Sequence, residues 1–286
     1  LAGPETGYTG YPCFNSPDEV AAALKNTGFD LVVTANNHIL DRGYKGAIRT
    51  MQTLKKYGLD IAGTAASPKE SRSHLVREIR GIKVGYLAYT YDTNGIPIPA
   101  YSPYLVNLVD KERILKDIDA LRPQVDVLVL VLHWGVEYSP YPTEQQQKLA
   151  REFFTRGADL ILGSHPHVIQ PMETMQINGK RKFVIYSMGN SIGNQHGDER
   201  NSGVIFNVEF TKDFENDDTF ISNVTYIPTF SHAYHENGQQ KFRVIPIEET
   251  IESIKAGRDP YLSAEDIPHL QAVLASTKER LGNSLP

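Results

Sequence analysis

The chain has 286 residues, a length within reach of one large α/β domain with a C-terminal extension. Its 29 Lys and Arg residues against 34 Asp and Glu give a net charge of −5 without a long basic run, which argues against a nucleic-acid or anionic-membrane surface. No apolar run approaches the length of a transmembrane helix, and the single cysteine, Cys13, excludes an intramolecular disulfide. Because the sequence starts at Leu1 without a signal peptide, we expect a processed protein or a segment of a longer one.

The first part of the chain predicts helices that alternate with short strands. After an irregular start, Ser16, Pro17 and Glu19 form a capping-box pattern that predicts a helix ending at Gly28. The following segments predict, in chain order, a strand at 29–34, a helix at 46–57, a strand at 59–62, a hairpin of 75–79 with 83–90, and a helix at 111–121.

The central part predicts a strand, a helix and a second strand. Seven apolar residues between Val125 and Leu132, interrupted only by Asp126, predict a strand buried on both faces that ends at His133. A helix is predicted over 144–156, with Gly157 as its C-terminal stop, and a second strand over 160–162. A right-handed parallel unit of this kind would bring His133, His165 and His167 to the carboxyl edge of one sheet, where α/β sheets bind ligands.

The remaining segments predict a more antiparallel region. Asn178-Gly179 is a strong turn signal that predicts a hairpin of 175–177 with 182–186. Segments 203–210 and 221–228 alternate as antiparallel strands do, and the chain is helical and polar after 248. We therefore expect two sheets packed together with helices outside them.

Imidazoles at strand ends are candidate metal ligands. Pro166 between His165 and His167 predicts an extended backbone at Ser164–His165, so that both imidazoles reach one metal or two neighbouring metals. The competing interpretation is that these histidines make ordinary local hydrogen bonds.

A second candidate cluster follows the strand at 29–34. The carboxamide oxygen of Asn37 is a hard, neutral metal ligand, although a turn residue is the alternative interpretation. His38 beside it can face a substrate, and Asp41 is close enough in sequence to orient that imidazole by a hydrogen bond.

Four segments, ANNHILDRG, LHWGVEY, GSHPHVIQPME and IYSMGN, resemble in order and spacing the motifs of calcineurin-like metallophosphoesterases, and more closely those of the CapA/PgsA family, linked to poly-γ-glutamate capsule synthesis. The resemblance covers about residues 1–247, which would form a CapA-like domain followed by a helical tail at 248–286. It implies a four-layer α/β/β/α sandwich that lacks the usual N-terminal strand or strands.

Carried over by motif, the resemblance implies that Asn37, His133 and His165 match ligands of one metal and His167 a ligand of a second. His38 matches the histidine that contacts the scissile phosphate, with Asp41 in support. The segment that lines the cleft would include Ser187, Gly189 and Asn190.

Two departures accompany the resemblance. Ile39 stands where the superfamily has an acid, and two family acids that end N-terminal strands, in Gly-Asp and Asn-Leu-Glu, have no counterpart in this sequence. We therefore expect two divalent ions, of Mn, Fe or Zn, in a full-length protein and one or none in this chain.

Aromatic residues in the loops beside these motifs are expected to rim the pocket. Tyr138 is the strongest candidate, because it lies five residues after His133. The complete set is Tyr8, Tyr11, Phe14, Tyr91, Tyr138 and Tyr141.

The function implied is poly-γ-glutamate capsule biosynthesis with a metal-dependent phosphoesterase-like site. Implied partners are a phosphorylated or acidic polymer and capsule synthase subunits, at the cell envelope or outside the cell, with no nucleic acid and no membrane span in this chain. The alternative is a non-catalytic, polymer-binding or scaffold component of the synthase complex.

Overall fold

The structure, a computed structural model, describes residues 1–282. Its contacts divide the chain into two compact units. Unit 1 consists of Leu1–Trp134 with Arg156–Ala158, and unit 2 of Gly135–Thr155 with the described residues from Asp159 onward. Among the described residues, no helix has both the length and the apolar composition needed to cross a membrane.

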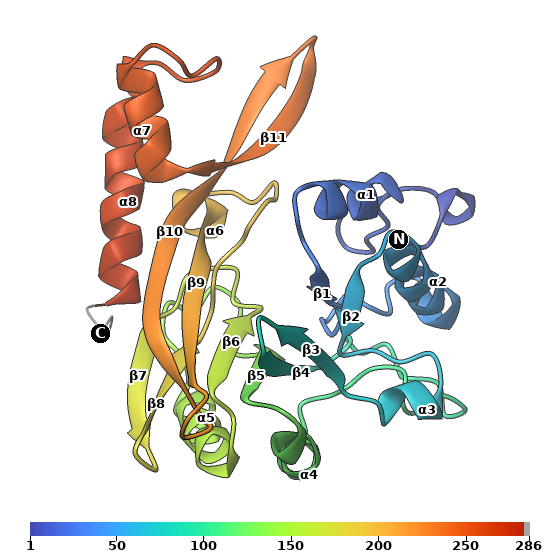
Figure 1. Cartoon of the computed structure of the whole chain (residues 1–286). Coiled ribbons are helices and arrows are strands. Elements are labelled where there is room, and N and C mark those ends of the chain that lie inside the picture. The colour runs from blue at the N-terminus through green and yellow to red at the C-terminus, as the bar shows by residue number, and fades with distance from the viewer. Residues whose placement is uncertain (283–286) are drawn as a thin grey trace. The chain divides into compact units, whose positions relative to one another are not determined.

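Unit 1 is a mixed α/β unit (Figure 1). Strands β1 and β2 pair in parallel, β3 and β4 form an antiparallel hairpin, and β5 pairs in parallel with β4. Its elements are η1 (Pro4–Thr6), α1 (Glu19–Asn26), β1 (Leu31–Val33), α2 (Gly43–Lys56), β2 (Asp60–Ala62), α3 (Pro68–Ser71), β3 (Leu75–Ile79), β4 (Ile82–Thr90), α4 (Lys111–Leu121), η2 (Arg122–Gln124) and β5 (Val127–His133).

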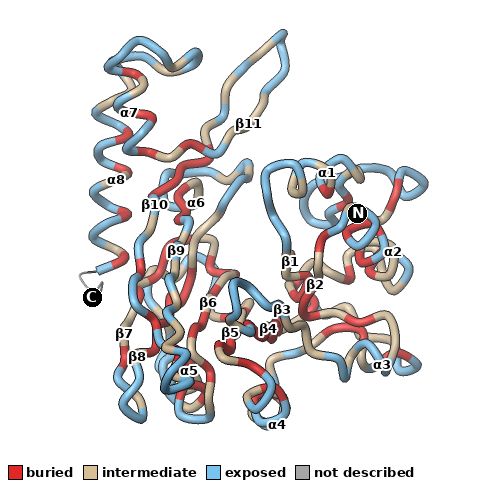
Figure 2. The backbone as a smooth tube through the Cα atoms, viewed as in Figure 1, coloured by how far each residue is buried: buried red, intermediate tan, exposed pale blue. Residues whose placement is uncertain are grey.

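Strand β5 forms as its apolar run predicts and is buried along most of its length (Figure 2). The single acid in that run, Asp126, lies just before the strand and accepts a hydrogen bond from Lys83 N at 2.7 Å, which explains its place in an apolar segment. Because Thr90 pairs with His133, strands β4 and β5 end at the same edge. The predicted strand end at His133 is confirmed.

Unit 2 contains two separate sets of paired strands. Strand β8 pairs in parallel with β6 and antiparallel with β7, whereas β9, β10 and β11 form an antiparallel sheet. Its elements are α5 (Glu144–Arg156, of which Arg156 belongs to unit 1), β6 (Leu160–Ser164), β7 (Met172–Ile177), β8 (Lys180–Ile185), α6 (Asp198–Asn201), β9 (Ser202–Asp213), β10 (Asp218–Glu236), β11 (Gln239–Pro246), α7 (Ile247–Lys255), η3 (Ala264–Asp266) and α8 (Ile267–Leu281).

The two C-terminal helices are anchored by an apolar cluster on the antiparallel sheet. Helices α7 and α8 pack on each other and against β10 (Figure 1). The buried members of this cluster are Phe230, Ile245, Ile247, Ile251, Ile254, Leu270 and Val273. The predicted helical character after 248 is confirmed, and the predicted domain boundary at 247 stays a prediction.

Three local predictions differ from the structure. Helix α1 begins at Glu19 rather than at Pro17, so the N-cap position is Asp18 and not Ser16; the Asp18 carboxylate pairs with Arg49 and does not cap the helix. The strand predicted at 29–34 is shorter, and Phe29 is 50% exposed. Strand β11 was not predicted, since its charged and amide residues show no clear alternation.

Candidate functional site

The predicted site residues Asn37, His38, Asp41 and His133 lie together in unit 1, and Asn94 joins them. These five residues are called the Asn37 group. His133 is the last residue of β5, and Asn37 follows β1 in a buried turn with 4% of its surface exposed. The strand ends therefore deliver these two residues, as the sequence predicts.

The Asn37 carboxamide points its oxygen at His133. Asn37 Nδ2 donates to Asn94 Oδ1 at 3.0 Å, which leaves Asn37 Oδ1 as the atom that faces His133 Nε2 at 2.9 Å. Ligand atoms about 2.0–2.2 Å from one ion lie roughly 3 Å apart when they occupy neighbouring positions. Because a carboxamide oxygen can only accept, His133 Nε2–H donates to Asn37 Oδ1 here; once that proton is lost, the two atoms have the spacing of neighbouring ligands on one divalent ion.

His38 is oriented by a carboxylate. Its Nδ1 lies 2.9 Å from Asp41 Oδ2, and the Asp41 side chain is only 4% exposed. The same oxygen accepts a hydrogen bond from Phe14 N at 2.8 Å. Since Nδ1–H is the donor to Asp41, Nε2 of His38 is left as the basic nitrogen. The contact that the sequence predicts between His38 and Asp41 is present.

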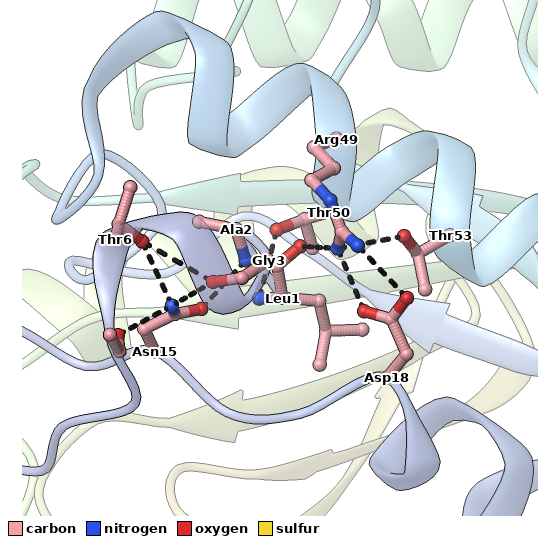
Figure 3. A network of polar contacts seen from close by, with 10 residues as sticks. Leu1, Ala2, Gly3, Thr6, Asn15, Asp18, Arg49, Thr50 and Thr53 are labelled. Atoms are coloured by element: carbon pink, nitrogen blue, oxygen red, sulfur yellow. Dashed lines mark hydrogen bonds and ion pairs between the residues drawn. The ribbon is translucent and has the colours of Figure 1, made fainter.

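A polar network fixes the segment that carries Phe14 (Figure 3). Asn15 is 3% exposed; its side chain accepts from Ala2 N at 2.7 Å and donates to Gly3 O and Gly7 O, each at 2.8 Å. The Phe14 ring then meets the His38 ring edge to face, with 4.6 Å between their centroids. Sequence reasoning missed this role of Asn15, because nothing local distinguishes it from other polar residues of a Gly- and Pro-rich loop.

Beside this network, Arg49 ties the start of α1 to α2. Its Nη1 donates to Leu1 O and to Asp18 Oδ1, each at 2.7 Å, and its Nη2 donates to Asp18 Oδ2 at 3.0 Å. This hydrogen-bonded pair lowers the pKa of Asp18 and raises that of Arg49. The loop that contacts His38 is thus held at both of its ends.

In unit 2, His165, His167, Asn190 and Tyr138 form a second cluster, called the His167 group. His165 and His167 have positive φ angles of 101° and 61°. The predicted extended backbone at His165 is therefore wrong. Positive φ is unusual for histidine and is strained, and such strain concentrates at functional sites. The turn also brings the two rings to 6.2 Å between centroids.

Asn190 orients the His167 ring. Asn190 Nδ2 donates to His167 O at 3.3 Å and to Arg200 O at 2.7 Å, so its amide orientation is set by two backbone carbonyls. Asn190 Oδ1 must then accept from His167 Nδ1, 3.0 Å away. With the proton on Nδ1, Nε2 of His167 carries the lone pair that a metal requires.

Close backbone packing holds Asn190 in place. Gly189 has a φ of 72°, and a Cβ there would overlap Ser202 O. A Cβ on Gly203 would likewise overlap Asn190 O. Ser187 is fully buried and its Oγ accepts from Gly189 N at 3.3 Å. Ser187 and Gly189, both predicted as lining residues, thus shape the turn that presents Asn190.

Tyr138 lies beside His167. Its backbone N–H donates to Pro166 O at 2.7 Å, and its ring stacks on His167 with 5.8 Å between centroids. The guanidinium carbon of Arg200 lies 4.0 Å from the centre of the Tyr138 ring. Sequence reasoning missed Arg200, although it follows two acids in a short polar run before β9.

Three of the six aromatic residues expected at a pocket rim each contact a predicted site histidine. Phe14 contacts His38, Tyr138 contacts His167, and Tyr91 stacks on His133 with centroids 6.5 Å apart. All six are exposed, from 41% for Tyr91 and Tyr138 to 85% for Tyr11. Their role as a rim stays a prediction.

The oxygen and nitrogen donors of the two groups are of types that bind divalent metals, but few of them are available. Asn37 Oδ1 and His133 Nε2 converge, and His167 Nε2 is available as a neutral nitrogen ligand. Within residues 1–282, no three side chains of His, Cys, Asp or Glu are grouped so that they could hold an ion. Asp41, the carboxylate of the Asn37 group, is hydrogen-bonded to His38 and to the Phe14 N–H.

Comparison with known sequences gives consistent matches. The sequence model of a family described as bacterial capsule synthesis protein PGA_cap matches residues 1–195. A capsule biosynthesis protein CapA of Bacillus anthracis is 30% identical over 185 residues, 63% of this chain and 44% of that protein. The PGA biosynthesis protein CapA of Bacillus subtilis is 31% identical over 179 residues, 62% of this chain and 46% of that protein. The chain thus spans less than half the length of these two relatives.

Solved structures agree on the fold. A putative 5′-nucleotidase from Staphylococcus aureus matches with a TM-score of 0.53 at 16% identity, over 91% of this chain and 44% of that one. A 5′-nucleotidase precursor from Thermus thermophilus matches with a TM-score of 0.50 at 15% identity, over 91% and 45% of the two chains. The predicted mixed α/β fold of phosphoesterase type, with several sheets, is confirmed.

Proposed function

The chain belongs to the bacterial capsule synthesis protein family PGA_cap, and from that premise we propose that it acts in poly-γ-glutamate capsule synthesis through a metal-dependent phosphoesterase site. The names of the CapA relatives support the biological role, and the phosphoesterase fold supports the chemistry. The observation that carries the proposal is the convergence of Asn37 Oδ1 and His133 Nε2, 2.9 Å apart, next to an imidazole held by a carboxylate.

His38 is the proposed general acid. Its Nδ1–H is donated to Asp41, so the carboxylate holds the ring in a fixed orientation. Nε2 of the imidazolium can then give its proton to the leaving-group oxygen of a phosphoester. Phe14 supports this arrangement, because its N–H donates to the same Asp41 oxygen and its ring limits the rotation of His38.

The proposed metal ligands are Asn37 and His133 in unit 1 and His165 and His167 in unit 2. Divalent Mn, Fe or Zn bound by either pair would polarise a phosphate as a Lewis acid. Asn190 holds His167 in the tautomer with a free Nε2, and Asn94 holds the Asn37 oxygen toward His133. These two asparagines therefore position ligands.

The proposed substrate is phosphorylated or acidic, and the proposed setting is the cell envelope, with capsule synthase subunits as partners. The names of the two CapA relatives support this setting.

The test is hydrolysis of an aryl phosphate by the purified protein with Mn²⁺, Fe²⁺ or Zn²⁺. We expect His133→Ala to lower the rate by at least about 100-fold, as loss of a ligand should, and His38→Ala by about 10²–10⁴-fold. His235→Ala is the matched control, because His235 is exposed on β10 in unit 2.

Thermal unfolding of each variant verifies that it is folded. A wild-type protein that hydrolyses no phosphoester with any of these ions would refute the enzymatic proposal. If that protein still bound poly-γ-glutamate, the scaffold function would be favoured instead.

A further inference from the structure

We propose that Arg200 is an anion-binding residue that holds an oxyanion of the substrate, a phosphate or a carboxylate, beside His167. The inference rests on the proposed function for the role of this anion, and it names the chemistry that the His167 group would recognise. Arg200 lies outside the four sequence motifs and outside residues 1–195, which the family model matches.

The position of Arg200 is fixed by the same residues that orient His167. Its backbone oxygen accepts from Asn190 Nδ2 at 2.7 Å, and Asn190 Oδ1 contacts His167 Nδ1 at 3.0 Å. Its guanidinium lies 4.0 Å from the Tyr138 ring centre, and Tyr138 in turn stacks on His167. One asparagine and one tyrosine therefore tie the arginine to the histidine.

The charge of Arg200 is not balanced by its neighbours. The two acids that precede it are engaged elsewhere: Asp198 pairs with His269 at 3.0 Å, and Glu199 pairs with Arg280, both on helix α8. Within residues 1–282, the Arg200 guanidinium forms no ion pair with a carboxylate and donates no hydrogen bond to a protein acceptor. The side chain is nevertheless half-buried.

A guanidinium in this state is suited to an oxyanion. It keeps its charge at all physiological pH values, and its N–H donors form a planar fork that matches two oxygens of a phosphate or a carboxylate. The contact with Tyr138 joins the guanidinium carbon to the ring and occupies none of the N–H donors in a hydrogen bond. A purely structural arginine would more commonly have an acid or a backbone carbonyl as its partner.

Anion binding can be measured without turnover. Backbone amide signals of Tyr138 and Asn190 are followed by ¹⁵N NMR during titration with inorganic phosphate and, separately, with a γ-linked glutamate oligomer. A chelator is present throughout, so that binding to a metal does not contribute. We expect saturable shifts with at least one of the two probes.

We expect Arg200→Gln to raise the dissociation constant about 10-fold or more, the effect of losing charge-assisted hydrogen bonds. Arg200→Lys should recover only part of the affinity, because an ammonium cannot replace the fork. Arg258→Gln is the matched control: Arg258 is an exposed arginine of unit 2, so this variant has the same net charge as Arg200→Gln. Its affinity should equal that of the wild type.

Saturation by phosphate alone supports the proposal with a phosphoryl group as the ligand, and saturation by the glutamate oligomer alone supports it with a carboxylate. The proposal is overturned if the wild type binds neither probe, if folded Arg200→Gln binds as well as the wild type, or if Arg258→Gln loses as much affinity. Aryl phosphate hydrolysis separates this proposal from the proposed function. If the wild type hydrolyses the aryl phosphate and Arg200→Gln binds the probes as well as the wild type, only the anion-site proposal is overturned. If binding depends on Arg200 but the wild type hydrolyses nothing, only the proposed enzymatic function is overturned.

Discussion

Replacing Asn190 by alanine should weaken stability and metal binding together. The Asn190 side chain makes three hydrogen bonds, to His167 Nδ1 at 3.0 Å, to His167 O at 3.3 Å and to Arg200 O at 2.7 Å. Each contributes about 0.5–1.5 kcal/mol net, so the free energy of unfolding should fall by roughly 2–4 kcal/mol. Urea denaturation measures this loss.

The same change should lower the affinity for Mn²⁺. Asn190 Oδ1 is the acceptor that keeps the proton on His167 Nδ1, and without it the ring is free to rotate and to change tautomer. Loss of such an outer partner lowers metal affinity by about 10–100-fold. Calorimetric titration with Mn²⁺ measures this effect.

Asn190→Asp separates the two effects. Aspartate keeps an oxygen that accepts from His167 Nδ1, but its second oxygen faces the two backbone carbonyls that Asn190 Nδ2 now contacts. We therefore expect Asn190→Asp to lose stability while its Mn²⁺ affinity stays within about tenfold of the wild type. Unchanged Mn²⁺ affinity in Asn190→Ala, or equal losses in both variants, would refute the reasoning.

Three further outcomes follow from single contacts. Gly203→Ala should lower the free energy of unfolding by about 1–3 kcal/mol, because its Cβ would overlap a backbone oxygen, whereas Gly193→Ala meets no atom within 4 Å and should be neutral. Asn15→Ala should cost about 2–4 kcal/mol in urea denaturation, since it removes the side chain's hydrogen bonds to three backbone groups. Burial and nearby Arg243 lower the pKa of His232 below its ordinary 6.5. The stabilisation by the neutral ring is therefore fully present above pH 6.5 and is lost as the pH falls below that value. His232→Gln should reduce this loss of stability between pH 7.5 and 5.5, as measured by denaturation at each pH.

The sequence predicts correctly those elements whose signals lie within a few neighbouring residues. The helix at 111–121 and the hairpin across Asn178-Gly179 occur as predicted, because their caps, periodicity and turn residues are encoded within a few positions. The His38–Asp41 contact was also within reach of the sequence, since it spans three residues. The apolar run before His133 likewise identified a strand and its end.

Long-range polar contacts have no such signal. Asn94 lies 57 residues from Asn37, and only the folded chain shows that its amide sets the direction of the Asn37 oxygen. Arg200 and Asn15 act through backbone carbonyls and ring faces, which leave no periodic pattern. The positive φ of His165 was missed because the residue before a proline normally avoids it, and tertiary packing overrides that preference.

The charges of the two groups point to an anionic ligand. The candidate donors are neutral in each group, Asn37 and His133 in unit 1 and His165 and His167 in unit 2, so a divalent ion held by either group would keep most of its positive charge. Arg200 adds a guanidinium that lacks a carboxylate partner among residues 1–282. Asp41 is the only acid of either group, and its charge is directed to His38 and to the Phe14 amide. With a neutral or cationic substrate, the positive charge of an ion on these neutral ligands would stay unbalanced. A phosphate or a polyglutamate carboxylate brings the negative charge that these residues lack.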